Sequence, residues 1–206
     1  MDSSTLDAKV RRSVAKEAAT LLYFGIEKEY RQAKLRAAET LGVHFLPSNL
    51  EVAIEFDRIA EENEGAARME RLVKMRREAL NLMKILEKFS PVLVGSVWRG
   101  TIYRESDIDI VVYHNEPHEI LKLLEEKFKV MECGWTAVTK KGKPKKSFRI
   151  LIGLPSGEKA EINVRGVEEL GAKETCEVYG DTISGLSVQE LEKVLSENPT
   201  KRFVPF

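Results

Sequence analysis

The spacing of apolar residues changes once along this chain, at residues 90–91. Before that point, apolar residues recur every three or four positions, as they do from Leu6 to Val14, and this spacing indicates helices. After it come short β-branched runs separated by turn residues, which indicate strands. We therefore predict an α+β chain, with a helical module over residues 1–89 and a mixed or antiparallel sheet backed by helices over 90–206.

Five strand-like runs and two helical runs follow in the second half. The last two strand candidates flank Pro155–Glu158, a turn sequence, and are therefore expected to form a hairpin. The final helix is expected over Val188–Ser196, with Ser187 as its N-cap. The strand candidates are PVLVG, DIDIVVY, VMECGWTAV, KSFRILIGL and KAEINVR, and the other helix is PHEILKLLEEKF.

Composition excludes several classes of protein. Lys+Arg and Asp+Glu balance at 33 each, which argues against a protein that coats nucleic acid by bulk charge. The 2 cysteines are far apart, so a zinc site or disulfide framework is not expected. No apolar run approaches the roughly 18–20 residues of a membrane span, and the first residues do not resemble a signal peptide. We expect a cytoplasmic protein that has no membrane partner.

Two carboxylates, Asp107 and Asp109, stand two residues apart in a predicted strand. Strand side chains alternate between faces, so both point the same way while Ile108 and Ile110 point into the core. Such a carboxylate pair is repulsive unless a cation lies between its members. Hard oxygen ligands suit Mg²⁺, which completes its shell with water and phosphate oxygens. The pair is therefore a candidate metal site.

The residues upstream of this pair suit phosphate. Gly95 lets the backbone approach a ligand closely, and Ser96 offers a hydroxyl group and a backbone N–H. Arg99 follows one short turn later and could neutralise a triphosphate.

Gly95-Ser96, ten intervening residues and Asp107-Ile108-Asp109 resemble the signature of the DNA polymerase β-like nucleotidyltransferase superfamily. The string GSVWRGT…SDIDI is similar to its small archaeal and bacterial members, including archaeal CCA-adding enzymes and minimal nucleotidyltransferases. The resemblance covers roughly residues 90–165. It implies transfer of a nucleoside monophosphate from an NTP such as ATP to an acceptor hydroxyl, with release of pyrophosphate.

The resemblance also implies two Mg²⁺ or Mn²⁺ ions and a third carboxylate on a later strand. Glu161 in KAEINVR fits that position, because its apolar neighbours fall on the opposite face. The acceptor is an RNA end, a protein hydroxyl or a small molecule. The alternative is an inactive nucleotide- or partner-binding regulatory module with the same fold.

Other interpretations remain for several of these residues. Glu161 could be a solvated strand residue paired with Arg165 or Lys159, and Arg99 could form a surface ion pair with Glu105. The basic run over residues 140–146 could contact a nucleic-acid backbone or form a solvated hairpin loop. Trp98 could stack on a base or cap the core. Arg76, on the apolar face of a predicted helix, is expected to form a tethering ion pair.

Overall fold

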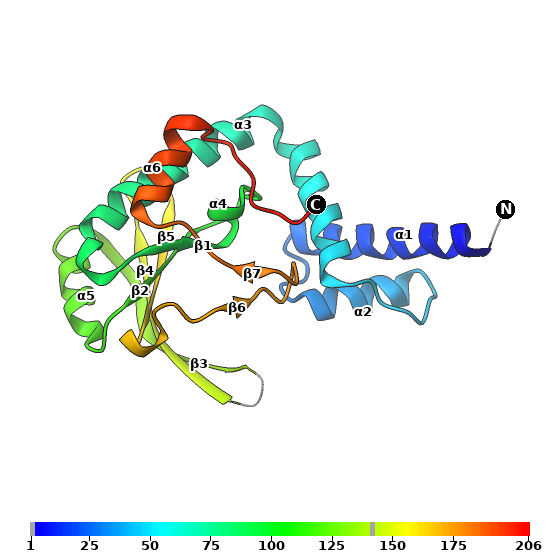
Figure 1. Ribbon diagram of the computed structural model, residues 1–206. Helices are drawn as coiled ribbons and strands as arrows, with labels where there is room; N and C mark the ends of the chain where they lie inside the picture. The colour runs from blue at the N-terminus through cyan, green and yellow to red at the C-terminus, as the bar shows by residue number, and fades with distance from the viewer. Residues whose placement is uncertain (1–2, 141–142) are drawn as a thin grey trace. The chain divides into compact units, whose positions relative to one another are not determined.

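The computed structural model describes residues 3–140 and 143–206 (Figure 1). The chain forms two compact units. The first contains the residues up to Arg68 together with 175–182 and 205–206, and the second contains 69–174 and 183–204.

The boundary between the units falls at Arg68, whereas the sequence suggested residue 89. Helix α3 spans Asn49–Ile85, but its backbone leaves the helical conformation at Gly65, with φ 54° and ψ −142°. Beyond this break, the helix contributes Leu72, Met75 and Leu82 to the core of the sheet-containing unit. The second half of α3 therefore belongs with the sheet because its apolar face is buried against it.

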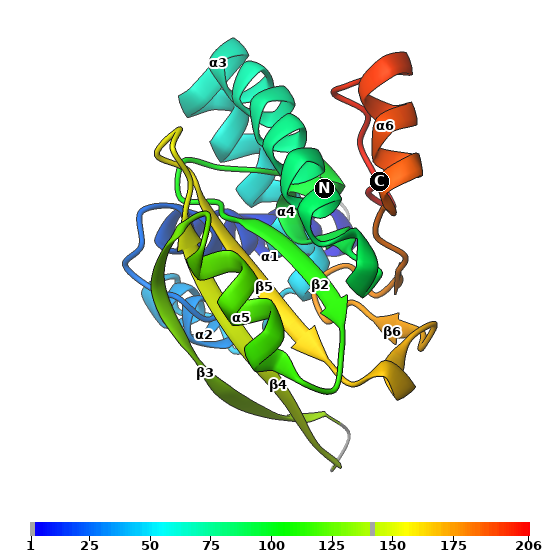
Figure 2. The same ribbon diagram turned by 90° about the vertical axis from the view of Figure 1, so that its left-hand side faces the viewer.

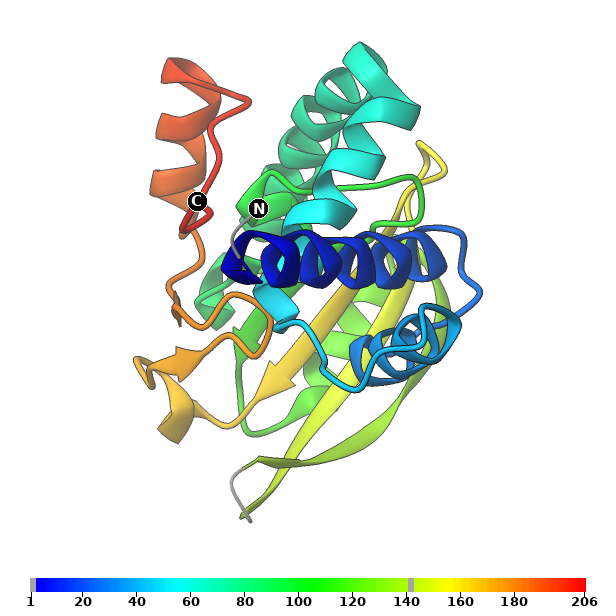
Figure 3. The ribbon, with the colours of Figure 1, turned by 90° about the vertical axis from the view of Figure 1, so that its right-hand side faces the viewer.

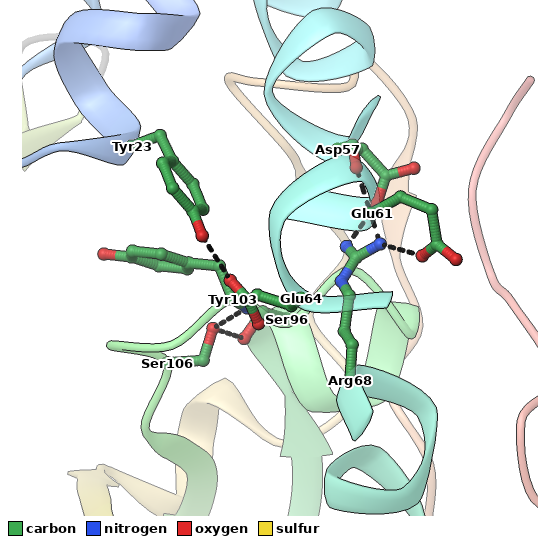
Figure 4. A network of polar contacts seen from close by, with 8 residues as sticks. All are labelled: Tyr23, Asp57, Glu61, Glu64, Arg68, Ser96, Tyr103 and Ser106. Carbon is green, nitrogen blue, oxygen red and sulfur yellow. Dashed lines mark hydrogen bonds and ion pairs between the residues drawn. The ribbon is translucent and has the colours of Figure 1, made fainter. Parts of the chain in front are cut away.

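The first unit is helical, as predicted. It contains α1 (Ser3–Tyr23), α2 (Tyr30–Thr40) and the first half of α3. Figure 3 shows α1 and α2 side by side. Small side chains such as Ala18 and Ala37 are completely buried and allow the helices to approach closely. After the Gly65 break, Arg68 donates to Asp57 over 2.5 Å and to Glu61 over 2.9 Å (Figure 4).

The second unit contains a five-stranded mixed sheet in the order β1-β2-β5-β4-β3. Strands β2 and β5 run parallel, and the other neighbours are antiparallel. This arrangement confirms the predicted α+β class and the predicted β4–β5 hairpin. The strands are β1 (Val92–Val94), β2 (Ile108–Tyr113), β3 (Lys129–Lys140), β4 (Lys143–Gly153) and β5 (Lys159–Arg165).

One face of this sheet forms the core. Ile110, Ile162 and Ile150 are partners across three strands and are completely buried. Figure 2 shows α5 (Pro117–Glu125) and the second half of α3 on the same side of the sheet. The basic run ends one strand and begins the next, and its residues 141 and 142 lie outside the described part of the chain.

The remaining elements are short or lie after the sheet. Helix α6 spans Val188–Glu197, and its predicted N-cap is confirmed: the Ser187 hydroxyl accepts from the Glu190 N–H, and the Glu190 carboxylate accepts from the Ser187 N–H. No helix in the described residues has the length and apolar character needed to cross a membrane. The short elements are α4 (Gly95–Arg99), the 3₁₀ turns η1 (Glu87–Phe89) and η2 (Val167–Glu169), and the paired strands β6 (Glu174–Thr175) and β7 (Thr182–Ile183).

Candidate active site

The carboxylate pair lies at the start of β2. Asp109 is the second residue of this strand, and Asp107 immediately precedes it. Ile108 and Ile110 are completely buried in the core, while both aspartates keep partial access to solvent. The alternation of a strand therefore directs both carboxylates away from the apolar face, as the sequence predicted.

Gly95 lies directly against this pair. It follows β1, which pairs antiparallel with β2 so that Val94 and Asp109 are register partners. A Cβ atom built on Gly95 would lie 2.7 Å from Cγ of Asp109 and would overlap its Oδ2. Gly95 also has φ 71°, a value that L side chains rarely adopt. Glycine is therefore required here both by the backbone conformation and by the position of the Asp109 carboxylate.

Glu161 lies next to the aspartates, on the neighbouring strand. Asp109 and Glu161 are register partners between the parallel strands β2 and β5, so their side chains project from the same face. This placement confirms the expected position of Glu161 in the sheet. Its role as a metal ligand stays a prediction.

The partner of Glu161 is a residue that the sequence did not single out. Nε of Arg149, on β4, donates to Oε2 of Glu161 over 2.5 Å, and Asn163 donates to Oε1 over 2.9 Å. Arg165, one of the expected partners, pairs with Glu174 at 3.0 Å. The alternation of polar and apolar residues in KSFRILI could have indicated this partner, because it places Arg149 on the other face of the strand from the buried Phe148 and Ile150.

The electrostatics of the site disfavour the ionised forms of Asp107 and Asp109. Burial raises the pKa of Asp109 to about 7, the negative charges of Glu161 and Asp107 act in the same direction, and Arg149 opposes them. Burial also raises the pKa of Asp107. The positive charges of Lys159, Arg149 and Arg71 oppose this increase, and the negative charge of Glu161 adds to it. A cation bound between Asp107 and Asp109 would favour their ionised forms and so offset the effect of burial.

The donor set fits a divalent cation in part. Asp107 and Asp109 present hard carboxylate oxygens from one strand, the ligand type that Mg²⁺ prefers. Within the described residues, however, no three His, Cys, Asp or Glu side chains are arranged so that together they could hold a metal ion. The pair is compatible with a cation as it stands, whereas Glu161 would first have to leave Arg149.

Ser96 and Ser106 position the loop that enters β2. The Ser96 hydroxyl donates to Oγ of Ser106 over 3.0 Å, and this oxygen also accepts from the Tyr103 N–H over 2.9 Å (Figure 4). Arg71 adds bonds to the carbonyls of Tyr103 and Ser106 and pairs with Glu158 at 2.6 Å. Because Ser106 directly precedes Asp107, these contacts hold the first carboxylate in place.

Arg99 occupies a different environment from the one expected. It is buried, its guanidinium donates to the carbonyl of Phe203 over 3.0 Å, and it lies 4.4 Å from the ring of Trp98. Glu105, its other suggested partner, forms a 4.0 Å ion pair with Arg104. Trp98 is itself buried and stacks on Phe203, so its ring caps the core. The structure therefore does not direct Arg99 or Trp98 towards the aspartates.

Comparisons with known proteins found distant similarities. A family model described as a domain of unknown function (DUF4269) matches residues 77–152, a stretch that includes Gly95, Asp107 and Asp109 and ends before Glu161. No curated protein matches the chain.

Several solved structures match part of the chain at low similarity. The GLD-2/RNP-8 complex matches at 15% identity and TM-score 0.35, over 59% of this chain and 39% of that chain. The polymerase core of TRAMP, an RNA surveillance complex, matches at 16% identity and TM-score 0.33, over 57% of this chain and 37% of that chain. The Cid1 poly(U) polymerase matches at 17% identity and TM-score 0.31, over 53% of this chain and 38% of that chain. The chain thus spans about two fifths of the length of these proteins. Similarity at this level does not assign a reaction to this chain.

Proposed function

We propose that this protein is a metal-dependent nucleotidyltransferase that moves a nucleoside monophosphate from an NTP to an acceptor hydroxyl. The observation that carries the proposal is the contact between Gly95 and Asp109. It places the G-S motif and the D-x-D motif, which are separated in the sequence, against one another at the start of β2. Because Gly95 has no side chain, the Asp109 carboxylate can lie directly against this backbone, where a Cβ would overlap it.

The proposed reaction makes one bond and breaks another. The acceptor hydroxyl gives up its proton to water, its oxygen attacks the α-phosphorus, the bond from that phosphorus to the bridging oxygen breaks, and pyrophosphate leaves. Mg²⁺ or Mn²⁺ held by Asp107 and Asp109, as a pair of ions in the full site, would supply neutralisation of the triphosphate and of the leaving group. The Ser96 hydroxyl is proposed to contact a phosphate oxygen, at the cost of its bond to Ser106.

Glu161 and Arg149 are proposed to exchange partners when the substrates bind. Glu161 would leave Arg149 and complete the ligand set begun by Asp109, its neighbour in register. Arg149 would then contact the triphosphate, the task that the sequence suggested for Arg99. A guanidinium binds phosphate oxygens through paired N–H donors, so the hydrogen bonds of Arg149 to phosphate would replace those that it loses to the Glu161 carboxylate.

A specific observation favours the alternative of an inactive regulatory module. The Arg149–Glu161 pair neutralises the third carboxylate, which an active site of this kind would need as a ligand. In such a module, a nucleotide could still bind beside the aspartates, but no transfer would follow.

Release of pyrophosphate distinguishes the two functions. Purified protein is incubated with Mg²⁺ or Mn²⁺, each NTP in turn, and RNA, protein or small-molecule acceptors from a cell extract. A transferase releases pyrophosphate and labels one acceptor class, Asp109→Asn abolishes both, and Asp7→Asn, on an exposed residue of α1, changes neither. Nucleotide binding without pyrophosphate release, under all of these conditions, would support the regulatory module and overturn the transferase.

A further inference from the structure

A cavity of about 460 Å³ lies at the far end of β5 from Glu161. Its wall includes Val164 near the end of β5, Gly166 directly after this strand, Trp135 from β3 and Lys146 from β4. This volume is within the range of small-ligand sites in proteins. Every residue that lines it belongs to the sheet-containing unit.

The cavity is separate from the carboxylate site. Trp135, Phe148 and Val164 are register partners across β3, β4 and β5, so their side chains share one face of the sheet. That face carries the buried residues of the core, whereas Asp109 and Glu161 project from the opposite face. A ligand in this cavity would therefore not touch the carboxylate pair.

Trp135 forms an exposed aromatic wall of the cavity. Trp135 is 63% exposed to solvent, although tryptophan is a large and mainly apolar residue. The indole packs edge-on against Phe148, with ring centres 5.4 Å apart at 75°, and Phe148 in turn contacts His118. One side of the ring system is thus supported by the protein while much of it faces solvent. A supported, exposed ring is a suitable surface for stacking a planar ligand.

The cavity is lined by both basic and acidic side chains. Lys146 contributes a cation beside the ring, and Glu168 and Glu169 of η2 contribute carboxylates. Arg165 also lines the cavity, and its guanidinium pairs with Glu174 at 3.0 Å. The basic run of the sequence continues on the strand that carries Lys146, which Lys143 and Lys145 precede.

These groups together suit a planar ligand that carries both an amino group and an anion. A flat ring would stack on Trp135, ring amino groups would donate to the carboxylates, and an attached anion would lie at Lys146. A simple anion would be repelled by Glu168 and Glu169, and a simple cation by Lys146. A nucleotide whose base carries an exocyclic amino group satisfies all three requirements, because carboxylates accept from such amines.

We propose that this cavity binds an adenine-, cytosine- or guanine-containing nucleotide, with its base on Trp135, its amino group at Glu168 or Glu169 and its phosphate near Lys146. This site goes beyond the proposed transferase reaction and does not depend on it. Uracil lacks the exocyclic amine and should bind more weakly. The nucleotide is either a free mononucleotide or one member of a single strand.

The two tryptophans of the chain allow a direct test in the presence of EDTA, which keeps metal out of the carboxylate site. Trp98 is buried, so a ligand that stacks on Trp135 should quench mainly the exposed fluorophore. AMP, CMP, UMP and ribose 5-phosphate are titrated first, followed by ten-residue oligo(A) and oligo(U). We expect saturable quenching by AMP and CMP, weaker quenching by UMP and none by ribose 5-phosphate.

Variants assign the binding to individual residues by dialysis against labelled AMP and by anisotropy of labelled oligo(A). Trp135→Ala should weaken binding at least about fivefold, the lower end of the effect of base–aromatic stacking. The double variant Glu168→Gln with Glu169→Gln should reduce the preference for AMP over UMP. Lys146→Ala should weaken the binding of AMP but not that of adenosine. Asp109→Asn should leave all of these affinities unchanged, which separates this site from the proposed active site. Circular dichroism checks that each variant is folded.

The titrations also distinguish the two sources of the nucleotide. Oligo(A) binding much more tightly than AMP would identify a single strand, and equal affinity would identify a free nucleotide. Absence of saturable quenching would overturn the proposal, as would unchanged binding by Trp135→Ala. Competition by inorganic polyphosphate as strong as that by oligo(A) would also overturn it, because charge alone would then explain binding.

Discussion

The Asp109 carboxylate lies so close to Gly95 that a single methyl group on the glycine would overlap it. This contact brings the end of β1 and the start of β2 together, and with them the two motifs on which the proposed site depends. Asp109 is thereby held by the backbone of the preceding element as well as by its own strand.

Gly95→Ala should therefore destabilise the protein and displace Asp109. The new side chain would have φ 71° and would also clash with the carboxylate, so we expect a loss of on the order of 2–4 kcal/mol in the free energy of unfolding. Gly157→Ala is a matched control, because Gly157 has φ 90° but no atom lies within 4 Å of the position that its new methyl group would take. Urea unfolding of both variants measures the difference, and equal losses would show that the carboxylate contact has no energetic weight.

The raised pKa of Asp109 predicts a pH-dependent stability in the absence of metal. The folded value of about 7 lies above the unfolded value of about 4, so the folded state binds the extra proton between these values. The resulting stability is fully present below pH about 4 and is lost as the pH rises through 7. Asp109→Asn removes this loss, so its stability relative to the wild type should increase by on the order of 2 kcal/mol between pH 5.5 and 8.5.

Urea unfolding in EDTA at these two pH values measures this change. Asp7→Asn serves as the control, since Asp7 is exposed on α1. A constant difference between Asp109→Asn and the wild type across this range would contradict the prediction.

Divalent cations should reverse the pH effect if Asp107 and Asp109 hold them. A cation competes with the proton on Asp109, so Mn²⁺ should raise the melting temperature more at pH 8 than at pH 6. The increase should disappear in Asp107→Asn and Asp109→Asn. Arg149→Met should enhance Mn²⁺ binding, because it frees Glu161 and removes a positive charge from the site. An unchanged Mn²⁺ response in both aspartate variants would exclude this metal site.

Arg76 should be among the most important polar residues for stability. It is completely buried, and its guanidinium donates to the carbonyls of Val97, Trp98, Pro199 and Lys201 over 2.7–3.1 Å. Within the part of the chain that the structure describes, these four carbonyls take the place of the carboxylate that the sequence suggested as its partner. Arg76→Met should cost about 3 kcal/mol or more, because buried acceptors lose their donor.

The neighbouring Arg77 provides the control for this substitution. Arg77 is exposed on the same helix, so Arg77→Met should change the unfolding free energy by less than about 0.5 kcal/mol. Arg76→Lys should also be destabilising, because one ammonium group cannot reach all four carbonyls. Faster proteolysis of residues 199–204 in Arg76→Met would locate the damage, and stability equal to that of Arg77→Met would refute the assignment.

Local patterns in the sequence were sufficient for the five strands of the main sheet and for the carboxylate pair, but not for the short strands β6 and β7. Alternation in DIDIVVY places Ile108 and Ile110 inside and Asp107 and Asp109 outside, whatever the rest of the chain does, because the strand period of two is a property of the backbone. The β4–β5 hairpin and the Ser187 cap were predictable for the same reason: a turn or a cap is formed by residues within a few positions of one another.

The partners of the charged residues were set only by contacts between distant segments. Arg99 meets Phe203 and Arg76 meets Pro199 because the C-terminal segment returns across α4, and no local pattern records that return. Arg149 meets Glu161 because β4 and β5 pair in one register, although Arg165 is closer in sequence to Glu161. Side-chain pairing depends on register and on burial, both of which arise when the sheet and its covering segments pack together. The motif residues could therefore be found from the sequence, while the environment that would tune their chemistry required the tertiary fold.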